Sequence, residues 1–157
     1  MAYTKINTEP ASTTFLISDM TDVQIAVSKI TNPLFIIEAS PIDRSLIGTM
    51  VSELGTNIIK YAGRGQIRIS RLMTDKTVDI QIWAEDRGPG IPNITRAMKE
   101  HFSTGNSLGL GLPGVRRMAD DFKIDSTNET GTVIYARKRI KGREFDHSGL
   151  KSVKQSM

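Results

Sequence analysis

A carboxylate and a carboxamide, Glu53 and Asn57, stand four residues apart in an otherwise apolar segment. Successive residues of a helix turn by about 100°, so these two side chains and Lys60 would form one stripe beside the apolar arc. A carboxamide oxygen suits Mg²⁺, a carboxylate can accept a proton, and a lysine can neutralise phosphate charge. The stripe therefore indicates a phosphate and metal site, with a solvated polar helix edge as the alternative.

A second polar patch, Asp86-Arg87-Gly88-Pro89-Gly90, follows an apolar run. Asp, Gly and Pro all favour turns, so an ordinary turn is one interpretation. Glycines such as Gly88 and Gly90 would also let a flat base approach the backbone, and Asp86 could accept a hydrogen bond from the exocyclic amine of adenine. This patch alone does not distinguish an ordinary turn from a site that binds a base.

A third patch, Gly105–Gly114, is rich in glycine and leads into a predicted helix. Residues 109–114 match the spacing of a dinucleotide-binding loop, but that loop needs a hydrophobic strand before it, and residues 101–107 are polar. A Walker loop is excluded because the chain has no Gly-Lys-Ser/Thr sequence. The patch therefore predicts a row of backbone N–H groups at a helix N-terminus, which suits phosphate.

The helices that must position these patches follow from apolar spacing and capping residues. Helical spacing over residues 19–37 contains Pro33, which predicts a break near Asn32, with a short strand over 34–37 as the alternative. Ser40 predicts the start of a helix that runs to about Tyr61 and stops at Gly63.

Alternation and turn residues predict the other elements, and residues 91–111 form a polar, glycine-dotted segment that we expect to be mobile. The predicted strands are 15–17, 66–72, 78–83, 122–126 and 132–137, and the further predicted helices are 95–101 and 113–121. Runs of strands and helices in this order predict an α+β fold, a two-layer sandwich of an antiparallel or mixed sheet with helices on one face.

Composition and charge limit the class of protein. The chain has 157 residues, 38% of them hydrophobic, and no cysteine, which indicates one globular domain without disulfides or thiolate metal sites. Residues 137–157 hold seven Lys/Arg and two acids, a net +5, so the total of +4 leaves −1 for residues 1–136. We expect a solvated basic tail after Ile140 rather than a nucleic-acid arm, because the tail lacks interleaved aromatic residues.

The sequence also gives expectations about location. No apolar run approaches the roughly 20 residues that span a bilayer, and the N-terminus lacks the apolar core of a signal peptide. We therefore expect a cytoplasmic protein that does not contact membranes.

Together the three patches resemble the conserved boxes of the Bergerat-fold (GHKL) ATPases. Glu53-Leu54-Gly55-Thr56-Asn57 looks like the N box, Asp86–Gly90 the first glycine box and Gly105–Leu112 the second, and Gly131-Thr132 resembles the last conserved turn. Within this superfamily, residues 61–67 and 102–104, together with 112–115, look most like the RsbT-type switch serine kinases, which are relatives of anti-sigma-factor kinases in bacterial stress signalling.

The resemblance implies a Bergerat two-layer fold, which we expect over residues 1–140, and a site for ATP and Mg²⁺ beneath a lid of about residues 91–110. Residues 141–157 depart from the family, whose members usually end near the last strand, and we expect them to form a basic, disordered tail. It implies that Asn57 is the metal ligand, Asp86 the reader of adenine and Glu53 the catalytic base, while Lys60 contacts phosphate and Thr132 supports Asp86. The remaining nucleotide-binding positions are backbone ones: Gly88, Gly90, Gly105, Gly109, Leu110 and Gly111.

The superfamily holds several activities, so the resemblance alone does not fix one. Neither His101 nor His147 resembles the phospho-acceptor of a histidine kinase. The resemblance implies a stand-alone serine/threonine kinase that phosphorylates a small STAS-type antagonist protein in partner switching. The alternative is a nucleotide-dependent switch that binds a PP2C-type phosphatase, its activator region or a sigma factor, and a nucleic-acid partner is a minor possibility.

Overall fold

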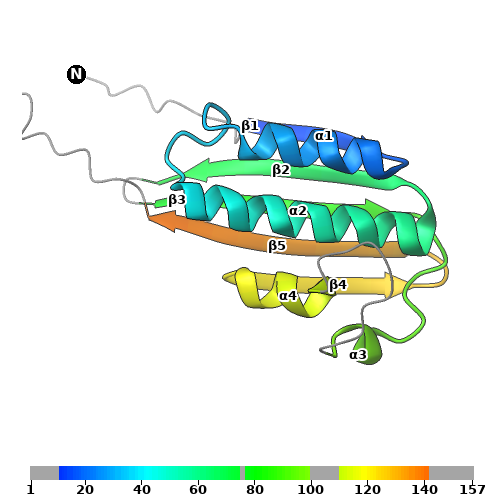
Figure 1. Cartoon of the computed structure of the whole chain (residues 1–157). Helices are drawn as coiled ribbons and strands as arrows, with labels where there is room; N and C mark the ends of the chain where they lie inside the picture. Colours follow the sequence, from blue (N-terminus) through cyan, green and yellow to red (C-terminus); the bar gives the residue numbers. More distant parts are fainter. Residues whose placement is uncertain (1–10, 75–76, 100–109, 142–157) are drawn as a thin grey trace, which may run out of the picture.

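The computed structural model describes residues 11–74, 77–99 and 110–141, and these form two layers (Figure 1). One layer is a five-stranded sheet in the order β1-β2-β3-β5-β4, in which every neighbouring pair is antiparallel. Its strands are β1 Ala11–Ile17, β2 Gly65–Met73, β3 Thr77–Asp86, β4 Asp121–Thr127 and β5 Gly131–Lys141. The other layer is helical and covers one face, so the predicted α+β sandwich is confirmed.

The helices of the second layer are α1 Met20–Thr31, α2 Pro41–Ala62 and α4 Gly111–Met118, and the single turn α3 Ile94–Ala97 lies at the lower edge in Figure 1. Asp19 caps α1 in a capping box with Asp22. Ser40 caps α2 by accepting from the Asp43 N–H, and Gly63 ends it with a positive φ of 78°. Local sequence therefore sets both ends of the helix that carries Glu53 and Asn57.

The predicted break near Asn32 is confirmed, because α1 ends at Thr31. The alternative of a strand over 34–37 is wrong, because this segment forms successive turns in which Phe35 N donates to Asn32 O and Ala39 N to Ile36 O. Only Ile36 of the stretch 34–37 is fully buried, and a run of turns can bury one side chain without pairing to a sheet.

Other predicted boundaries move by a few residues. The helix predicted at 95–101 is the turn α3, and the helix predicted at 113–121 begins at Gly111 and ends at Met118. Alternation alone predicts that the last strand ends at 137, whereas β5 continues to Lys141. The strand is longer because β3 provides pairing partners as far as Thr77, which is opposite Lys141. Residues 100–109 of the predicted lid and 142–157 of the predicted tail lie outside the described residues.

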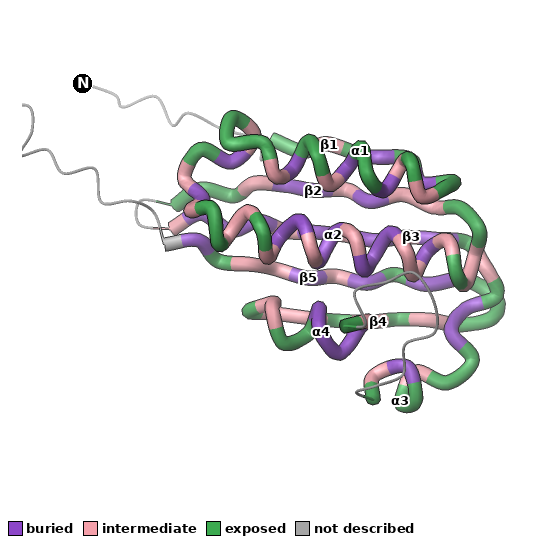
Figure 2. The backbone as a smooth tube through the Cα atoms, in the orientation of Figure 1, coloured by how far each residue is buried: buried purple, intermediate pink, exposed green. Residues whose placement is uncertain are grey.

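The core lies between the helices and the sheet, as the buried inner sides of α2, β3 and β5 show in Figure 2. Ile47, Leu54 and Ile58 of α2 pack onto this core together with Ile80 and Ile82 of β3. Among the described residues, no helix is long and apolar enough to cross a membrane.

On the uncovered face of the sheet, Asp79 of β3 forms an ion pair network with β5. Arg139 donates to the carboxylate from Nε at 2.8 Å and from Nη2 at 3.0 Å, and Arg137 Nη1 lies 3.3 Å from it. The hydrogen bonds from Arg139, with the charges of Arg139 and Arg137, hold the pKa of Asp79 below its usual value, while partial burial opposes this shift.

A lowered pKa in the folded state predicts acid lability. The stabilisation by Asp79 is fully present above the ordinary aspartate pKa of about 3.9 and is lost as the pH falls through the lower folded value. We expect Asp79→Asn to lower the free energy of unfolding at pH 7 by about 1–2 kcal/mol. Urea unfolding of both proteins from pH 7 to pH 2 should show the difference shrinking below about pH 4; a constant difference across this range would contradict the assignment.

Candidate functional site

The polar stripe on α2 runs from the core to the surface. Glu53 is buried, with 4% of its surface exposed, Asn57 one turn later is half-buried, and Lys60 is exposed. The Asn57 carboxamide makes no hydrogen bond with the described part of the chain, whereas Lys60 Nζ lies 5.2 Å from the centre of the Tyr61 ring. The stripe thus offers a desolvated carboxylate and an accessible amide oxygen on one side of a rigid helix.

The carboxylate of Glu53 links α2 to the start of α4. Its Oε2 accepts a hydrogen bond of 3.1 Å from the backbone N–H of Gly111, across 58 residues of chain. The first N–H groups of a helix have no partner within the helix and carry a partial positive charge. Glu53 therefore lies at the anion-binding end of α4, which is where the sequence predicts the phosphates.

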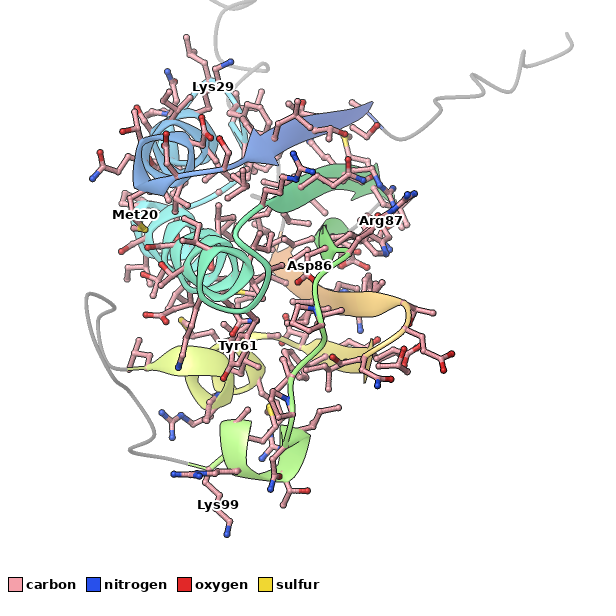
Figure 3. The ribbon with its side chains drawn as sticks, turned by 90° about the vertical axis from the view of Figure 1, so that its right-hand side faces the viewer. Met20, Lys29, Tyr61, Asp86, Arg87 and Lys99 are labelled. Atoms are coloured by element: carbon pink, nitrogen blue, oxygen red, sulfur yellow. The ribbon has the colours of Figure 1, made fainter. Side chains whose placement is uncertain are left out.

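Asp86 is the last residue of β3 and has 7% of its surface exposed. In Figure 3, which looks along α2, it lies at the end of the sheet nearest the viewer. Its Oδ1 accepts a 2.9 Å hydrogen bond from the Gly88 N–H, an Asx turn that fixes the carboxylate. The other oxygen has no hydrogen-bond partner in the described residues, so it is available to an amine donor.

Strand register places Thr132 next to Asp86, and Ser126 next to Thr132, on the helix-covered face. Thr132 of β5 is paired with Asp86 of β3 and with Ser126 of β4. Thr132 Oγ1 lies 2.7 Å from Ser126 Oγ, which also accepts a 2.8 Å hydrogen bond from the Ile91 N–H. Thr132 is 1% exposed, so its hydroxyl is shielded from bulk water.

The glycines of the site differ in what surrounds them. A Cβ on Gly88 would lie 2.5 Å from Ala62 Cβ of α2, and one on Gly90, whose φ is 79°, would lie 2.6 Å from Thr127 O. Both glycines are therefore required by packing against the protein itself. At Gly111, whose φ is 54°, the one atom of the described residues that a Cβ would meet is Pro113 Cδ, at 3.6 Å, so these residues leave space beside the glycine.

Two of the predicted glycines, Gly105 and Gly109, lie outside the described residues. Leu110, which the sequence places in the same loop, is the N-cap of α4 and is 38% exposed. The Leu110 side chain makes no capping hydrogen bond to α4, and among the described residues Glu53 accepts from the first N–H of the helix.

These residues fit a nucleotide with Mg²⁺. In the residues that the structure describes, no three His, Cys, Asp or Glu side chains gather as a metal site. A cation held mainly by phosphates and water, with one protein oxygen, is the usual state of Mg²⁺ in kinase sites. The half-buried Asn57 carboxamide supplies such an oxygen, and the open N-terminus of α4 supplies donors for phosphate.

Sequence reasoning missed Ser126. It lies in a strand in which Phe122 and Ile124 alternate with Lys123 and Asp125, so a period of two places Ser126 on the face of the two apolar side chains. This alternation was an available signal, and the register adds that Ser126 pairs with Thr132 across the turn.

Comparisons with known proteins agree with this geometry. Residues 42–142 match the family described as histidine kinase-, DNA gyrase B- and HSP90-like ATPase. The serine/threonine-protein kinase RsbT of Bacillus subtilis is 45% identical over 100 residues, which is 64% of this chain and 75% of that protein. An anti-sigma F factor of Bacillus licheniformis is 34% identical over 122 residues, 72% of this chain and 82% of that protein.

Among solved structures, the mycobacterial sensor histidine kinase MprB matches with a TM-score of 0.44 and 20% identity, over 86% of this chain and 97% of that one. The family match covers more than half of the chain and contains Glu53, Asn57, Asp86 and Thr132. The chain belongs to the family of histidine kinase-, DNA gyrase B- and HSP90-like ATPases.

Proposed function

We propose that this protein is an ATP-dependent serine/threonine kinase. The observation that carries the proposal is the bond between the buried Glu53 carboxylate and the Gly111 N–H, because it brings a proton acceptor to the phosphate-binding end of α4. The similarity to a relative named a serine/threonine-protein kinase supports the same activity. The site would take ATP with Mg²⁺, with Asp86 at the base and Asn57 at the metal.

Each residue would contribute positioning or charge, which is most of what phosphoryl transfer requires. Glu53 accepts the proton of a serine or threonine hydroxyl while the oxygen of that hydroxyl forms a bond to the γ-phosphorus. The bond between the γ-phosphorus and the β–γ bridging oxygen breaks, and ADP is released. Bound Mg²⁺ neutralises charge on the phosphates. The N–H groups at the start of α4 hold phosphate oxygens, with Lys60 as a further cation.

We further infer that the substrate is a small STAS-type antagonist protein in a bacterial partner-switching pathway of stress or sigma-factor regulation. The resemblance of residues 61–67 to RsbT-type kinases supports this substrate class. We also infer a cytoplasmic location, with residues 1–140 as the kinase domain and 141–157 as a separate basic tail. The match to the family model, which ends at residue 142, supports this division.

A second candidate function is a nucleotide-dependent binding switch with little kinase activity. The similarity to an anti-sigma F factor over 82% of that protein favours it. Such a switch would bind or release a sigma factor, or a PP2C-type phosphatase, according to the bound nucleotide. It needs the base and phosphate contacts of the site but has no use for a proton acceptor at Glu53.

Substitution of Glu53 by glutamine separates the two functions. Glutamine has the same shape and can still accept from the Gly111 N–H, but it cannot take up a proton from the substrate. We expect Glu53→Gln to bind ATP like the wild type and to transfer phosphate at least about a hundredfold more slowly. Calorimetry with ATP and single-turnover transfer to the STAS partner measure these two properties.

Thr56→Ala, a change at a half-buried position on the same helix, is the matched control, because among the described residues the Thr56 hydroxyl bonds to the Ser52 carbonyl within that helix and to nothing else. It should retain both ATP binding and transfer. Transfer by Glu53→Gln at the wild-type rate would refute the assignment of Glu53 as base, and absence of transfer by the wild type would favour the switch.

A further inference from the structure

Three segments that carry or directly follow Asn57, Asp86 and Gly111 have an excess of positive charge. They are the second half of α2 with the turn after it (54–64), the loop after β3 with α3 (87–99), and α4 with its flanking residues (110–119). These segments contain no Asp or Glu and seven Lys or Arg, all of them exposed: Lys60, Arg64, Arg87, Arg96, Lys99, Arg116 and Arg117. These seven side chains form the cationic rim of the site.

The positive charge is concentrated on this side of the molecule. Glu53 and Asp86, the two acids of the site itself, are buried, and they lower the net charge there from +7 to +5. The remaining described residues carry nine Lys or Arg and ten Asp or Glu, a net charge of −1. Residues 100–109, which lie outside the described residues, add one acid, Glu100, and no Lys or Arg to the sequence. The surplus of cations therefore belongs to the surface around the site.

Several cations of the rim are not neutralised by neighbouring acids. Within the described ranges, four of them make no ion pair: Arg64, Arg87, Lys99 and Arg116. On the uncovered face of the sheet, by contrast, Arg137 and Arg139 are both held by Asp79. The rim thus presents charge to solvent, where an oppositely charged partner can meet it.

The rim extends past the groups that would hold the nucleotide. Figure 3 shows Arg87 above Asp86 and Lys99 well below it. On α4, which contacts both α2 and α3, Arg116 lies five residues after Gly111, about 7.5 Å further along the helix axis. Bound Mg²⁺ would itself neutralise part of the phosphate charge. Cations on several sides of the site therefore leave a positive potential toward an approaching protein.

We propose that the cationic rim is the docking surface for an acidic face of the protein substrate, beside the hydroxyl that receives the phosphoryl group. This inference rests on the proposed kinase function. Complementary charge raises the rate of encounter and orients the partner before short-range contacts form. An acidic surface that docks across α3 and α4 would bring the substrate hydroxyl to the start of α4, where Glu53 accepts from the Gly111 N–H.

The residues of the rim favour an acidic protein over a nucleic acid, which is also an anion. Tyr61 is the one aromatic residue in the three segments, and it is half-buried, so the rim offers no row of rings on which bases could stack. Duplex DNA needs no such rings, so it enters the test as a competing ligand.

Reversal of two rim charges in the full chain tests the inference. Lys99→Glu/Arg116→Glu should raise the KM for the STAS-type partner about tenfold at low salt, because each added carboxylate repels an acidic surface. The kcat and the Kd for ATP should stay at the wild-type values, since neither side chain has a role in the ATP site. Neutralisation in Lys99→Gln/Arg116→Gln should raise KM by a smaller factor, about threefold.

Initial rates at increasing partner concentration measure KM and kcat, and calorimetry measures the Kd for ATP, with the thermal midpoint of each variant in parallel. The rates are repeated at several NaCl concentrations, and the wild-type KM should rise more steeply with salt than that of the charge-reversed variant. Lys29→Glu/Lys123→Glu reverses two exposed cations outside the rim and is the matched control, with the wild-type KM.

A KM for the charge-reversed variant equal to that of the control would overturn the inference. So would a rise in the Kd for ATP as large as the rise in KM, which would assign the rim to the nucleotide. Duplex DNA that binds the wild type more tightly than the partner does, and is lost from Lys99→Glu/Arg116→Glu, would assign the rim to nucleic acid. These outcomes leave the kinase function intact, whereas a wild type that binds ATP but transfers nothing to the partner would overturn both.

Discussion

Asp86→Asn is expected to weaken ATP binding about ten- to a hundredfold, because a hydrogen bond to a charged group contributes about 1.5–3 kcal/mol. The carboxylate presents one oxygen to the Gly88 N–H and would present the other to the adenine amine. A carboxamide has one oxygen and one NH₂ group, so it cannot offer acceptors in both directions. Calorimetric titration with ATP and Mg²⁺ measures the loss.

The matched control for this change is Asp125→Asn, which removes an exposed carboxylate from β4, one residue from Ser126. It changes the net charge equally but leaves the base site unaltered, so its Kd for ATP should stay at the wild-type value. Equal affinities for Asp86→Asn and the wild type would show that Asp86 does not contact the base.

Asn57→Ala is expected to reduce phosphoryl transfer by at least about a hundredfold, because misplacement of the metal and the γ-phosphate by about 1 Å has an effect of this order. The protein should remain folded. Asn57 is half-buried and makes no side-chain hydrogen bond within the described residues, and alanine favours a helix interior more than asparagine does. Rates at increasing Mg²⁺ concentration, with the thermal midpoint of each protein, measure both effects.

Ser45→Ala, near the other end of the same helix, controls for any general effect of alanine in α2. Since it does not touch the site, it should transfer phosphate at the wild-type rate. A folded Asn57→Ala protein with normal activity and normal dependence on Mg²⁺ would exclude Asn57 as the metal ligand.

The fold was predictable where local signals and burial agreed. The helix α2 begins after Ser40 and ends at Gly63, as the sequence predicted, and the alternation of apolar and polar residues predicted the hairpin of β2 and β3. The helix break at Asn32 followed from Pro33, but the turns after it did not, because only the tertiary structure decides that Ile36 is buried while Leu34 and Ile37 are exposed.

The candidate site was predictable in its residue types and only partly in its contacts. Glu53 and Asn57 could be placed on one helix edge from their spacing, but the bond from Gly111 to Glu53 spans 58 residues and depends on how α4 packs on α2. From the sequence, Gly88 and Gly90 were predicted to let a ligand approach the backbone. In the structure, the position that a Cβ would take at Gly88 is next to Ala62, and that at Gly90 is next to Thr127. Ser126 was missed although alternation places it on the face of Phe122 and Ile124, because its hydrogen bond from the Ile91 N–H spans 35 residues and depends on how the loop after β3 packs on β4.

The central claim is that this chain transfers the γ-phosphoryl group of ATP to a hydroxyl of another protein. The most direct measurement is incubation of the full chain with γ-labelled ATP, Mg²⁺ and a STAS-type partner, followed by identification of the labelled amino acid. The account predicts label on serine or threonine of the partner with the wild type and with Ser45→Ala, and at least about a hundredfold less with Asn57→Ala. Label on a histidine, or none on the partner while ATP binds normally, would contradict it.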